Sequence, residues 1–444
     1  MTRVTNPHHI DQPMGIGAIE HLFDRLWGLS RSLTGNGVRQ SFEILHEHIP
    51  YDIHEMASGE EVFDWTVPLE WNVRDAWLET PDGRRIARFT DNNLHLMGYS
   101  EPMDQTLPWS ELTSHLYIDN NMPNAIPYRT SYYKRNWGFC LTKNEYDQLP
   151  REGDYRVFID SSLEDGSLTY GDIVLDGISD REVFFSSYIC HPSLANNELS
   201  GPLLQSLIYK YVSGLQNRHY TYRFLLAPET IGSIVYLDRY GEHLKSNMLA
   251  GFILTCTGLD THFTYKRSRK INSYTDRLVE RVLSSNHCAQ NVGIEIRDFY
   301  PYGSDERQYC SPGFDLPVGS IMRGVPGEYP EYHSSADNKD LLSFPALLDV
   351  FEVYKEIIDE IESDRFYRSN NPYCEPRLGK SGLYPNTGGE VHSREIRALN
   401  WVINLSDGKH SVRDIVDLSK IPADTIEKSI SILLEAGIIC LGGM

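Results

Sequence analysis

The most constraining feature of this sequence is an alternation of apolar strands and amphipathic helices that begins near Arg181. "VFFSSYI" is followed by "SGPLLQSLIYKYV", and "YRFLLA" is followed by a helical pattern from about Ile231 to Leu244. The segment "AGFILTC", a helix near 275–285, the segment "LPVGSIM" and a helix near 345–361 continue the series. Short apolar runs separated by helices are typical of an α/β layer with a largely parallel sheet.

The region before this alternation has a different texture. Helical spacing at 16–29 and 38–48 predicts two opening helices. Between about 60 and 177, short alternating or aromatic runs such as "VFDWTVPLEW" and "RVFID" are broken by "PDG", "EDG" and "YGD". Such runs indicate strands, hairpins and turns. The sequence therefore predicts an α/β domain formed by 1–60 and 178–366, interrupted by a β-rich inserted domain at 61–177.

The last segment, 367–444, has the spacing of a winged-helix domain. "SVRDIVDLS", the turn "KIP" and "ADTIEKSISILLEAG" follow one another as two helices around a short turn. A DNA-binding regulator would need a basic surface here. From residue 370 onward the chain has eight Lys and Arg against nine Asp and Glu. We therefore expect this domain to pack against the rest of the protein or a neighbouring subunit and not to bind nucleic acid.

The charge and the cysteines bound the function further. With 62 acidic and 41 basic residues, a net charge of −21, the chain is repelled by phosphate backbones and anionic membranes. No uncharged run reaches the roughly 20 residues that span a bilayer, and the N-terminus has no apolar signal segment. Seven scattered cysteines without a CxxC pair fit reduced thiols. We expect a cytoplasmic protein, without membrane or nucleic-acid partners, for which a homo-oligomer stays open.

Polar residues that could carry chemistry follow three of the predicted strands. His191 comes directly after "VFFSSYI", Glu229 after "YRFLLA", and His333 and Asp337 after "LPVGSIM". Each alone is readily explained as a polar group satisfied by the backbone or by water. In open α/β sheets, however, ligands gather at the carboxyl ends of strands. Two imidazoles and a carboxylate at one such edge could hold a divalent ion and accept a proton from its water.

Longer motifs carry a family resemblance. The order "CHPSLANNELSG", "PETIGS", "YGSDERQYCSPGFDLPVGSIMR" and "EYHSSAD" resembles the zinc aminopeptidases of the M28 type. With "FDWTVPLEW", "IPYRTSYY" and the winged-helix tail, nearly the whole chain resembles the aminopeptidase-like proteins of bacterial surface-polysaccharide and natural-product gene neighbourhoods. The resemblance implies an α/β fold of zinc-exopeptidase type, with a mixed sheet and helices on both faces.

The resemblance also implies roles for single residues. His191 matches the first metal-binding histidine and His333 the last, while Asn197 stands where these families place a metal-binding aspartate. Glu229 matches the general base, and Asp305 matches an aspartate beside the catalytic centre.

Charge then decides between one metal ion and two. The families' further metal-binding carboxylates correspond to Thr230 and lie near Thr255, so amide and hydroxyl groups replace carboxylates at three positions. A two-zinc cluster needs those carboxylates, and we expect one ion, Zn²⁺ or another divalent metal. Three interpretations stay open: Asn197 is a weak ligand, it is not a ligand, or Glu198 takes its place.

The function implied is a metal-dependent aminopeptidase-like hydrolase that cleaves an amide bond of a small aminoacyl or peptidyl conjugate in a biosynthetic pathway. Asp305 or Glu306 could bind a substrate ammonium, and Arg307 or Arg323 a carboxylate or phosphate. Structural ion pairs would explain these residues equally well. The alternatives are a one-metal acyltransferase or cyclase, and a catalytically impaired protein that binds an amine-bearing metabolite.

Overall fold

The computed structural model describes residues 15–383 and 393–442 and divides into two compact units. The first unit takes the described residues up to Leu175 together with 183–216 and 222–355. The second takes 176–182, 217–221 and the described residues from 356 onward. The β-rich segment thus belongs almost entirely to the first unit. The predicted division into three domains is finer than this one and stays a prediction.

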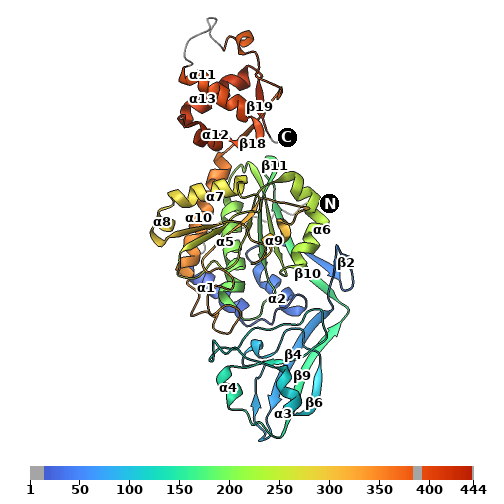
Figure 1. Cartoon of the computed structure of the whole chain (residues 1–444). Helices are drawn as coiled ribbons and strands as arrows, with labels where there is room; N and C mark the ends of the chain where they lie inside the picture. Colours follow the sequence, from blue (N-terminus) through green and yellow to red (C-terminus); the bar gives the residue numbers. More distant parts are fainter. Residues whose placement is uncertain (1–14, 384–392, 443–444) are drawn as a thin grey trace. The chain divides into compact units, whose positions relative to one another are not determined.

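An eight-stranded mixed sheet forms the centre of the fold (Figure 1). Its outer pairs β1–β10 and β10–β12 and the pair β14–β16 are antiparallel, whereas β13–β16 and β14–β15 are parallel. The family resemblance implied a mixed sheet, and this prediction is confirmed. The alternation predicted a largely parallel sheet, and this prediction is wrong for the three antiparallel pairs. A parallel pair needs a long crossover, whereas only residues 176–178 join β10 to β11, so these two strands run in opposite directions. In spatial order the strands are β1 (Asp52–Ala57), β10 (Ser167–Leu175), β12 (Tyr220–Ala227), β11 (Ser179–Tyr188), β13 (Met248–Ile253), β16 (Val318–Met322), β14 (Phe263–Lys266) and β15 (Ile294–Arg297).

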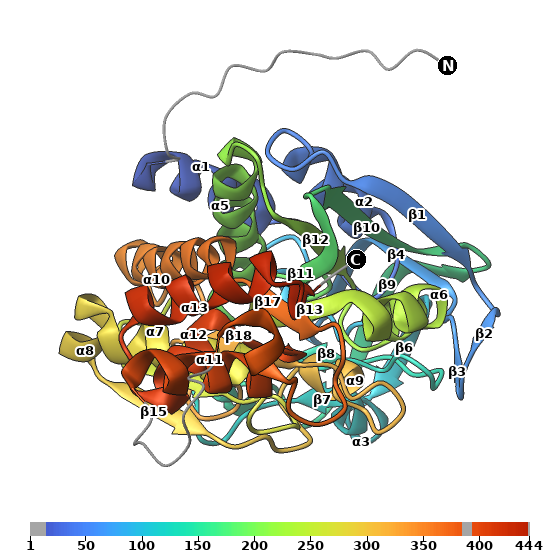
Figure 2. The same cartoon turned by 90° about the horizontal axis from the view of Figure 1, so that it is seen from above.

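Helices cover both faces of this sheet, as predicted. Successive side chains of a strand point to opposite faces, and Phe184 and Phe185 of β11 show the consequence. Phe184 stacks on Tyr236 of α6 with ring centroids 6.2 Å apart, whereas Phe185 meets Tyr354 of α10 edge-on at 5.9 Å. Figure 2 shows α5 and α10 on the opposite side of the sheet from α6. The helices of this layer are α1 (Ile16–Trp27), α2 (Asn36–Leu45), α5 (Ser200–Gly214), α6 (Ile231–Asn247), α7 (Tyr274–Ser285), α8 (His287–Val292), α9 (Glu306–Tyr309) and α10 (Phe344–Ser363).

The β-rich segment contains a second sheet of four strands, in the order β5-β4-β9-β6. Its long central pair buries Trp77 against Phe158, with ring centroids 5.0 Å apart. Its elements are β2 (Glu61–Val62), β3 (Trp65–Thr66), β4 (Glu70–Glu79), β5 (Arg85–Ile86), η1 (Asn93–His95), β6 (Met103–Pro108), α3 (Trp109–Leu112), η2 (Thr113–His115), β7 (Leu116–Tyr117), β8 (Phe139–Cys140), α4 (Lys143–Asp147) and β9 (Asp154–Glu164).

A loop of this segment reaches the α/β layer. Pro127 forms an isolated bridge with Ser334, and the backbone N–H of Tyr128 donates to the carbonyl of His333 over 2.8 Å. The insertion is therefore in direct contact with one of the two predicted metal-binding histidines.

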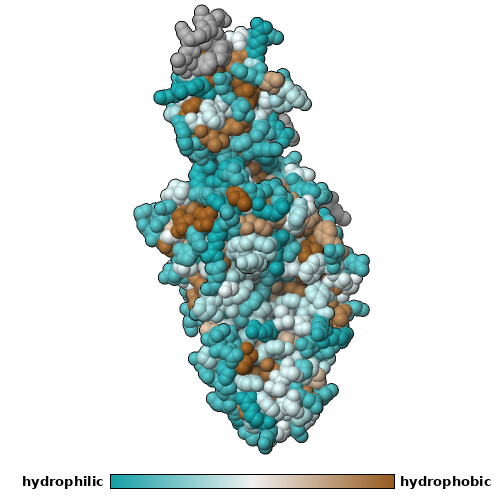
Figure 3. All heavy atoms as spheres, in the orientation of Figure 1, coloured by the Kyte–Doolittle hydropathy of each residue, from teal (hydrophilic) through white to brown (hydrophobic). Residues whose placement is uncertain are grey.

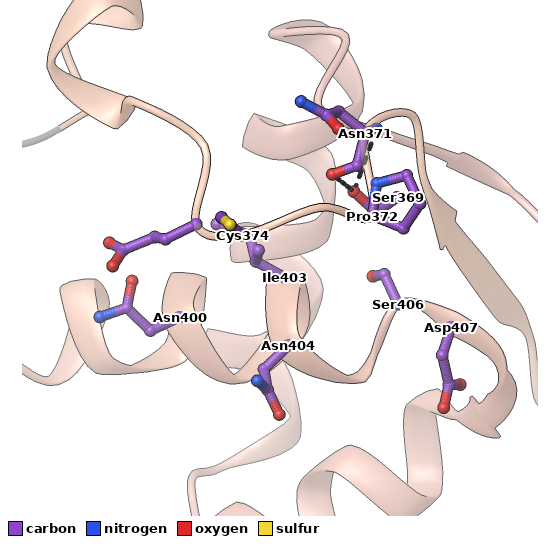
Figure 4. A pocket seen from close by; sticks show the side chains of 10 residues that line it. Ser369, Asn371, Pro372, Cys374, Asn400, Ile403, Asn404, Ser406 and Asp407 are labelled. Atoms are coloured by element: carbon purple, nitrogen blue, oxygen red, sulfur yellow. Dashed lines mark hydrogen bonds between the residues drawn. The ribbon is translucent and has the colours of Figure 1, made fainter.

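The C-terminal part has the predicted winged-helix architecture, in which three helices pack on a small sheet ordered β18-β17-β19. Ala398, Val402, Ile426 and Leu433 are fully buried at its core. A cavity of about 460 Å³ beside α11 is lined by Asn400, Asn404 and Asp407 among others, and by none of the predicted site residues (Figure 4). Its elements are β17 (Phe366–Ser369), η4 (Leu378–Ser381), α11 (Arg394–Leu405), β18 (Asp407–Ser411), α12 (Val412–Ser419), α13 (Ala423–Glu435) and β19 (Ile439–Leu441).

The surface agrees with the acidic, polar composition. The face in Figure 3 is mostly hydrophilic, and its hydrophobic patches are small and separate. Within 15–383 and 393–442, none of the helices combines the length and hydropathy that a membrane crossing requires.

Candidate metal and substrate site

His191 lies in the loop that follows β11, and its ring is held from behind. Its Nδ1–H donates to Oε2 of Glu198 over 2.8 Å, and its carbonyl accepts a hydrogen bond of 3.0 Å from Nε of Arg31. Its Nε2 lies 3.8 Å from Oε2 of Glu229. Burial lowers the pKa of His191, but the neighbouring Cys190 and the Glu198 carboxylate outweigh it and raise the pKa well above its ordinary value. Because Nδ1 is paired with Glu198, a metal ion could bind this ring only through Nε2, after the Nε2 proton is lost.

Glu198 sits on η3 (Ala195–Leu199), a π-helical turn that leads into α5. Its Oε1 is 3.6 Å from Nε of Arg31, and both side chains are fully buried. This arrangement is the carboxylate–histidine pair that commonly orients a metal-binding imidazole. The sequence raised Glu198 as a substitute metal ligand, whereas both of its carboxylate oxygens face His191 or Arg31.

His333 supplies the second imidazole. Its backbone is left-handed, with φ 56°, and its ring stacks on Tyr332 with centroids 4.0 Å apart. The rings of His191 and His333 lie 5.5 Å apart, centroid to centroid. Burial, with the charges of His191 and Arg129, lowers the pKa of His333 to about 3, so the ring is neutral at neutral pH. Its Nε2 is buried without a hydrogen-bond partner among the described residues.

Asp337 connects the loops that carry the two histidines. Its carboxylate accepts hydrogen bonds from the backbone N–H groups of Asn196 at 2.7 Å and Asn197 at 3.0 Å. The hydroxyl of Tyr329 donates to the same carboxylate over 3.1 Å. A fully buried carboxylate therefore fixes the turn η3 relative to the loop of His333.

The neutral residues that replace family carboxylates form a small network of their own. Oδ1 of Asn197 accepts a hydrogen bond of 3.1 Å from the hydroxyl of Tyr188, which is also 2.6 Å from Oγ1 of Thr255. Nδ2 of Asn197 is buried and has no partner among the described residues. The hydroxyl of Tyr188 also donates, over a shorter distance, to the backbone carbonyl of Asn197, so Oδ1 is the more weakly held of the two oxygens.

Glu229 and Asp305 form a pair of carboxyl groups at the end of β12. Oε1 of Glu229 accepts a hydrogen bond of 3.0 Å from Ser304, and Oδ1 of Asp305 accepts one of 2.7 Å from the backbone N–H of Thr230. Burial raises the pKa of Glu229, although the charges of His191 and Arg307 oppose this. Burial and the neighbouring Glu229 raise the pKa of Asp305 to about 8. A carboxylate with a raised pKa is suited to accept and return a proton.

The remaining predicted substrate-binding residues have different surroundings. Glu306 is 2.5 Å from Nζ of Lys266 in a buried ion pair. Arg323 is buried and donates to the carbonyl of Thr261 at 2.8 Å and to carboxylates at 3.0 and 3.2 Å. To bind a substrate, Glu306 and Arg323 would have to give up these partners. Arg307 donates from Nη2 to Oγ1 of Thr230 over 2.8 Å and reaches a cavity.

This cavity, of about 340 Å³, opens beside Glu229. Aromatic side chains of the β-rich segment, Trp65, Tyr132 and Tyr133, are part of its lining. Arg31, Tyr128 and Tyr132 also surround the site and were not predicted; the motif "IPYRTSYY", which contains both tyrosines, contributed only to the family resemblance. The lining residues are Leu33, Trp65, Tyr132, Tyr133, Cys190, Glu229, Thr230, Ile231, Arg307 and Gln308.

These residues fit one divalent ion and do not fit two. Two imidazoles converge, one with an unpartnered buried nitrogen and one with its second nitrogen anchored by a carboxylate. Donor atoms of Cys190, His191 and Glu198 also lie within 4.8 Å of one another. Burial raises the pKa of the Cys190 thiol to about 11, so this sulfur stays protonated and is a poor ligand. Neutral groups at 197, 230 and 255 leave too little negative charge for a second ion.

Comparisons with known proteins place this geometry in a family. Residues 20–364 match the family described as a domain of unknown function (DUF4910), and residues 365–440 match a winged helix-turn-helix family. A Clostridium acetobutylicum protein, named as a candidate polysaccharide biosynthesis protein with an aminopeptidase-like domain, is 46% identical over 400 residues, which cover 90% of each chain. A crystal structure of a candidate peptidase from the same species covers 96% of each chain at 43% identity, with a TM-score of 0.78.

More distant structures share the fold alone. A zinc aminopeptidase from Bacillus subtilis has a TM-score of 0.55 at 12% identity, covering 77% of this chain and 94% of its own. An M28 peptidase precursor from Shewanella amazonensis has a TM-score of 0.53 at 12% identity, covering 78% of this chain and 92% of its own. The first unit therefore has the fold on which zinc aminopeptidases are built.

Proposed function

This chain belongs to the family described as a domain of unknown function (DUF4910), and we propose that it is a metal-dependent hydrolase. Its substrate would be the amide bond of a small aminoacyl or peptidyl conjugate in a biosynthetic pathway. The aminopeptidase-like fold and the name of the Clostridium acetobutylicum relative support the reaction class and the setting. The observation that carries the proposal is the convergence of His191, His333 and Glu229, of which Glu229 lines a cavity.

In this proposal His191 and His333 hold a single Zn²⁺ or another divalent ion through their Nε2 atoms, with an oxygen of Asn197 as a weak third ligand. A bound ion would supply a Lewis acid for the scissile carbonyl and would lower the pKa of a water molecule. Glu229 would accept a proton from the attacking water and return it to the leaving amine. Glu198 keeps the proton of His191 on Nδ1. Glu229 is positioned by the hydroxyl of Ser304, and Asp305 accepts a hydrogen bond from the backbone of the next residue, Thr230.

A second candidate function follows from the neutral residues 197, 230 and 255. A weaker metal site fits an acyltransferase or cyclase that uses one ion, or a protein that binds an amine-bearing metabolite without turnover. The same residues would hold the ligand in each case, but the products would differ in mass, since hydrolysis adds one water and cyclisation adds none.

The test uses the full-length protein. Metal analysis of the purified protein should find about one divalent ion per chain, and mass spectrometry of a panel of aminoacyl and acylamino amides should show products one water heavier in sum. Glu229→Gln should remove turnover while zinc stays bound. Absence of any metal together with no turnover after zinc, manganese or cobalt is added would contradict the proposal.

We also propose a location and a partner class for the whole protein. The seven free cysteines and the acidic composition support a cytoplasmic location and no nucleic-acid partner. The winged-helix unit would then serve protein contacts. Retention of the full chain on duplex DNA at physiological salt would contradict this.

A further inference from the structure

The cavity beside Glu229 contains one arginine, Arg307, that forms no ion pair with a described carboxylate, although its charge acts on Glu229 and Asp305 from a greater distance. Its Nη2 donates to Oγ1 of Thr230, and its buried Nε has no partner among the described residues. No described carboxylate lies within 4.0 Å of the guanidinium, whereas Arg31, Arg267 and Arg323 each have such a partner. Burying part of a charged group without a partner is costly. An arginine in this state is ready to bind an anion.

The same cavity offers little to an ammonium group. Among its lining residues Glu229 is the only carboxylate. Glu306 is occupied by Lys266 at 2.5 Å, with both side chains almost completely buried. Oδ1 of Asp305 is occupied by the backbone of Thr230 and by the hydroxyl of Ser233 at 3.1 Å. A substrate with a free amine would have only the proposed base Glu229 as its partner.

The residue at position 230 explains why Arg307 has no carboxylate partner. Where the M28 pattern places a metal-binding glutamate, this chain has Thr230, and the guanidinium donates to its hydroxyl. A carboxylate at this position would neutralise the arginine. A hydroxyl is neutral, so it accepts a hydrogen bond from the guanidinium and leaves the positive charge for another partner.

We propose that Arg307 binds a carboxylate of the substrate, so that the conjugate ends in an acid and carries no free amine at the bond that is cleaved. This inference rests on the proposed hydrolysis and names its substrate class: N-acylated amino acids and related carboxylate-terminated amides. Guanidinium pairs with carboxylate through two parallel hydrogen bonds. Leu33, Trp65 and the Tyr132–Tyr133 pair line the same cavity and would contact the apolar part of the conjugate. A volume of about 340 Å³ suits a ligand of this size.

The test measures binding to the metal-free, full-length protein by calorimetry, so that it does not depend on turnover. The probes are N-acetylphenylalanine, its uncharged methylamide, phenylalanine amide with a free amine, and phenyl phosphate. The acid should bind about ten- to a hundred-fold more tightly than the methylamide and the amine, as expected for charge-assisted hydrogen bonds. Arg307→Met should abolish this preference, and Arg307→Lys should keep part of it. Arg74→Met, which removes an exposed arginine paired with Asp160, is the matched control and should change nothing.

Several results would overturn the inference. They are equal or tighter binding of phenylalanine amide, unchanged binding of the acid to Arg307→Met, tighter binding of phenyl phosphate than of the acid, and no binding of the acid at millimolar concentration. If Arg307→Met does not fold, Arg307→Lys still has to weaken binding of the acid. Binding without any hydrolysis would leave this carboxylate site standing and remove the proposed function. Hydrolysis of free-amine substrates that is insensitive to Arg307→Met would do the reverse.

Discussion

Replacing Glu198 with glutamine tests whether the site depends on the carboxylate behind His191. Glutamine keeps the shape and one acceptor oxygen for Nδ1 of His191, but it removes the charge that faces Arg31 at 3.6 Å. At this distance and an effective dielectric constant of 20, the attraction amounts to about 4 to 5 kcal/mol. Because Arg31 stays buried, most of that attraction is lost without replacement by water. We expect Glu198→Gln to lower the free energy of unfolding by about 3 to 5 kcal/mol.

The same substitution should weaken metal binding. A carboxylate that accepts the second N–H of a metal-binding histidine raises the basicity of the ring, and its loss typically costs about 10- to 100-fold in affinity. Urea unfolding of the metal-free protein gives the first effect, and zinc titration against a competing chelator gives the second. Glu47→Gln, which removes an exposed partner of Arg25, is the control and should leave both quantities as they are.

The two measurements separate structural from site effects. A loss of stability without a loss of zinc affinity would mean that Glu198 serves the fold and does not orient a metal ligand. If Glu198→Gln matched the wild-type protein in both, the buried pair of Arg31 and Glu198 would not contribute as its geometry implies, and the reasoning would be refuted.

Three further predictions use other parts of the molecule. Asn197→Asp should raise zinc affinity about tenfold or more and raise turnover with it, because a carboxylate binds the ion better than an amide; chelator competition and rate measurements check this. The pKa of Glu70 is lowered to about 2 by hydrogen bonds from Arg39, so this pair stabilises the fold fully above about pH 4.5 and loses its contribution as pH falls toward 2. Glu70→Gln should therefore lower stability by about 1 to 2 kcal/mol at neutral pH after solvent screening, and the two proteins should converge in acid unfolding curves. In Gly201→Ala the new Cβ would lie 2.3 Å from the carbonyl oxygen of Leu254, so the melting temperature should fall by several degrees, whereas Gly214→Ala on the same helix should be tolerated.

The strands and helices of the first unit could be predicted because each is encoded locally. The helix expected at 275–285 begins at Tyr274 in the structure, since the side chain of Ser273 caps it together with Asp276. The direction of β10 could not be predicted in this way. It depends on the turn that joins β10 to β11, and the periodicity of neither strand records it.

The candidate site was predictable only in part. Strand ends pointed to His191, Glu229 and His333, and the structure brings these three together. His191 contacts Arg31 across 160 residues of sequence, and His333 contacts Tyr128 across 205, and periodicity does not record such contacts. The pattern also grouped Arg307 with Arg323, although only the first reaches the cavity. Only the long-range packing of the folded chain distinguishes Arg307 from Arg323, because the sequence pattern gives both the same role.

Positions 197 and 198 show how a chain can share a family fold and still differ in the chemistry of its site. The family resemblance implies a carboxylate at position 197, whereas this chain has its carboxylate at position 198. On the turn η3, consecutive side chains point in different directions: Asn197 meets Tyr188, whereas Glu198 meets His191 and Arg31. The carboxylate of Glu198 therefore does not lie where Asn197 lies, on the side where a metal ion would bind. It contacts the opposite side of the His191 ring, at Nδ1. Neutral groups at 230 and 255 remove further negative charge, and Arg307 adds a positive one. We expect a site with this balance to bind a single cation and an anionic substrate, on a fold that the chain shares with zinc aminopeptidases.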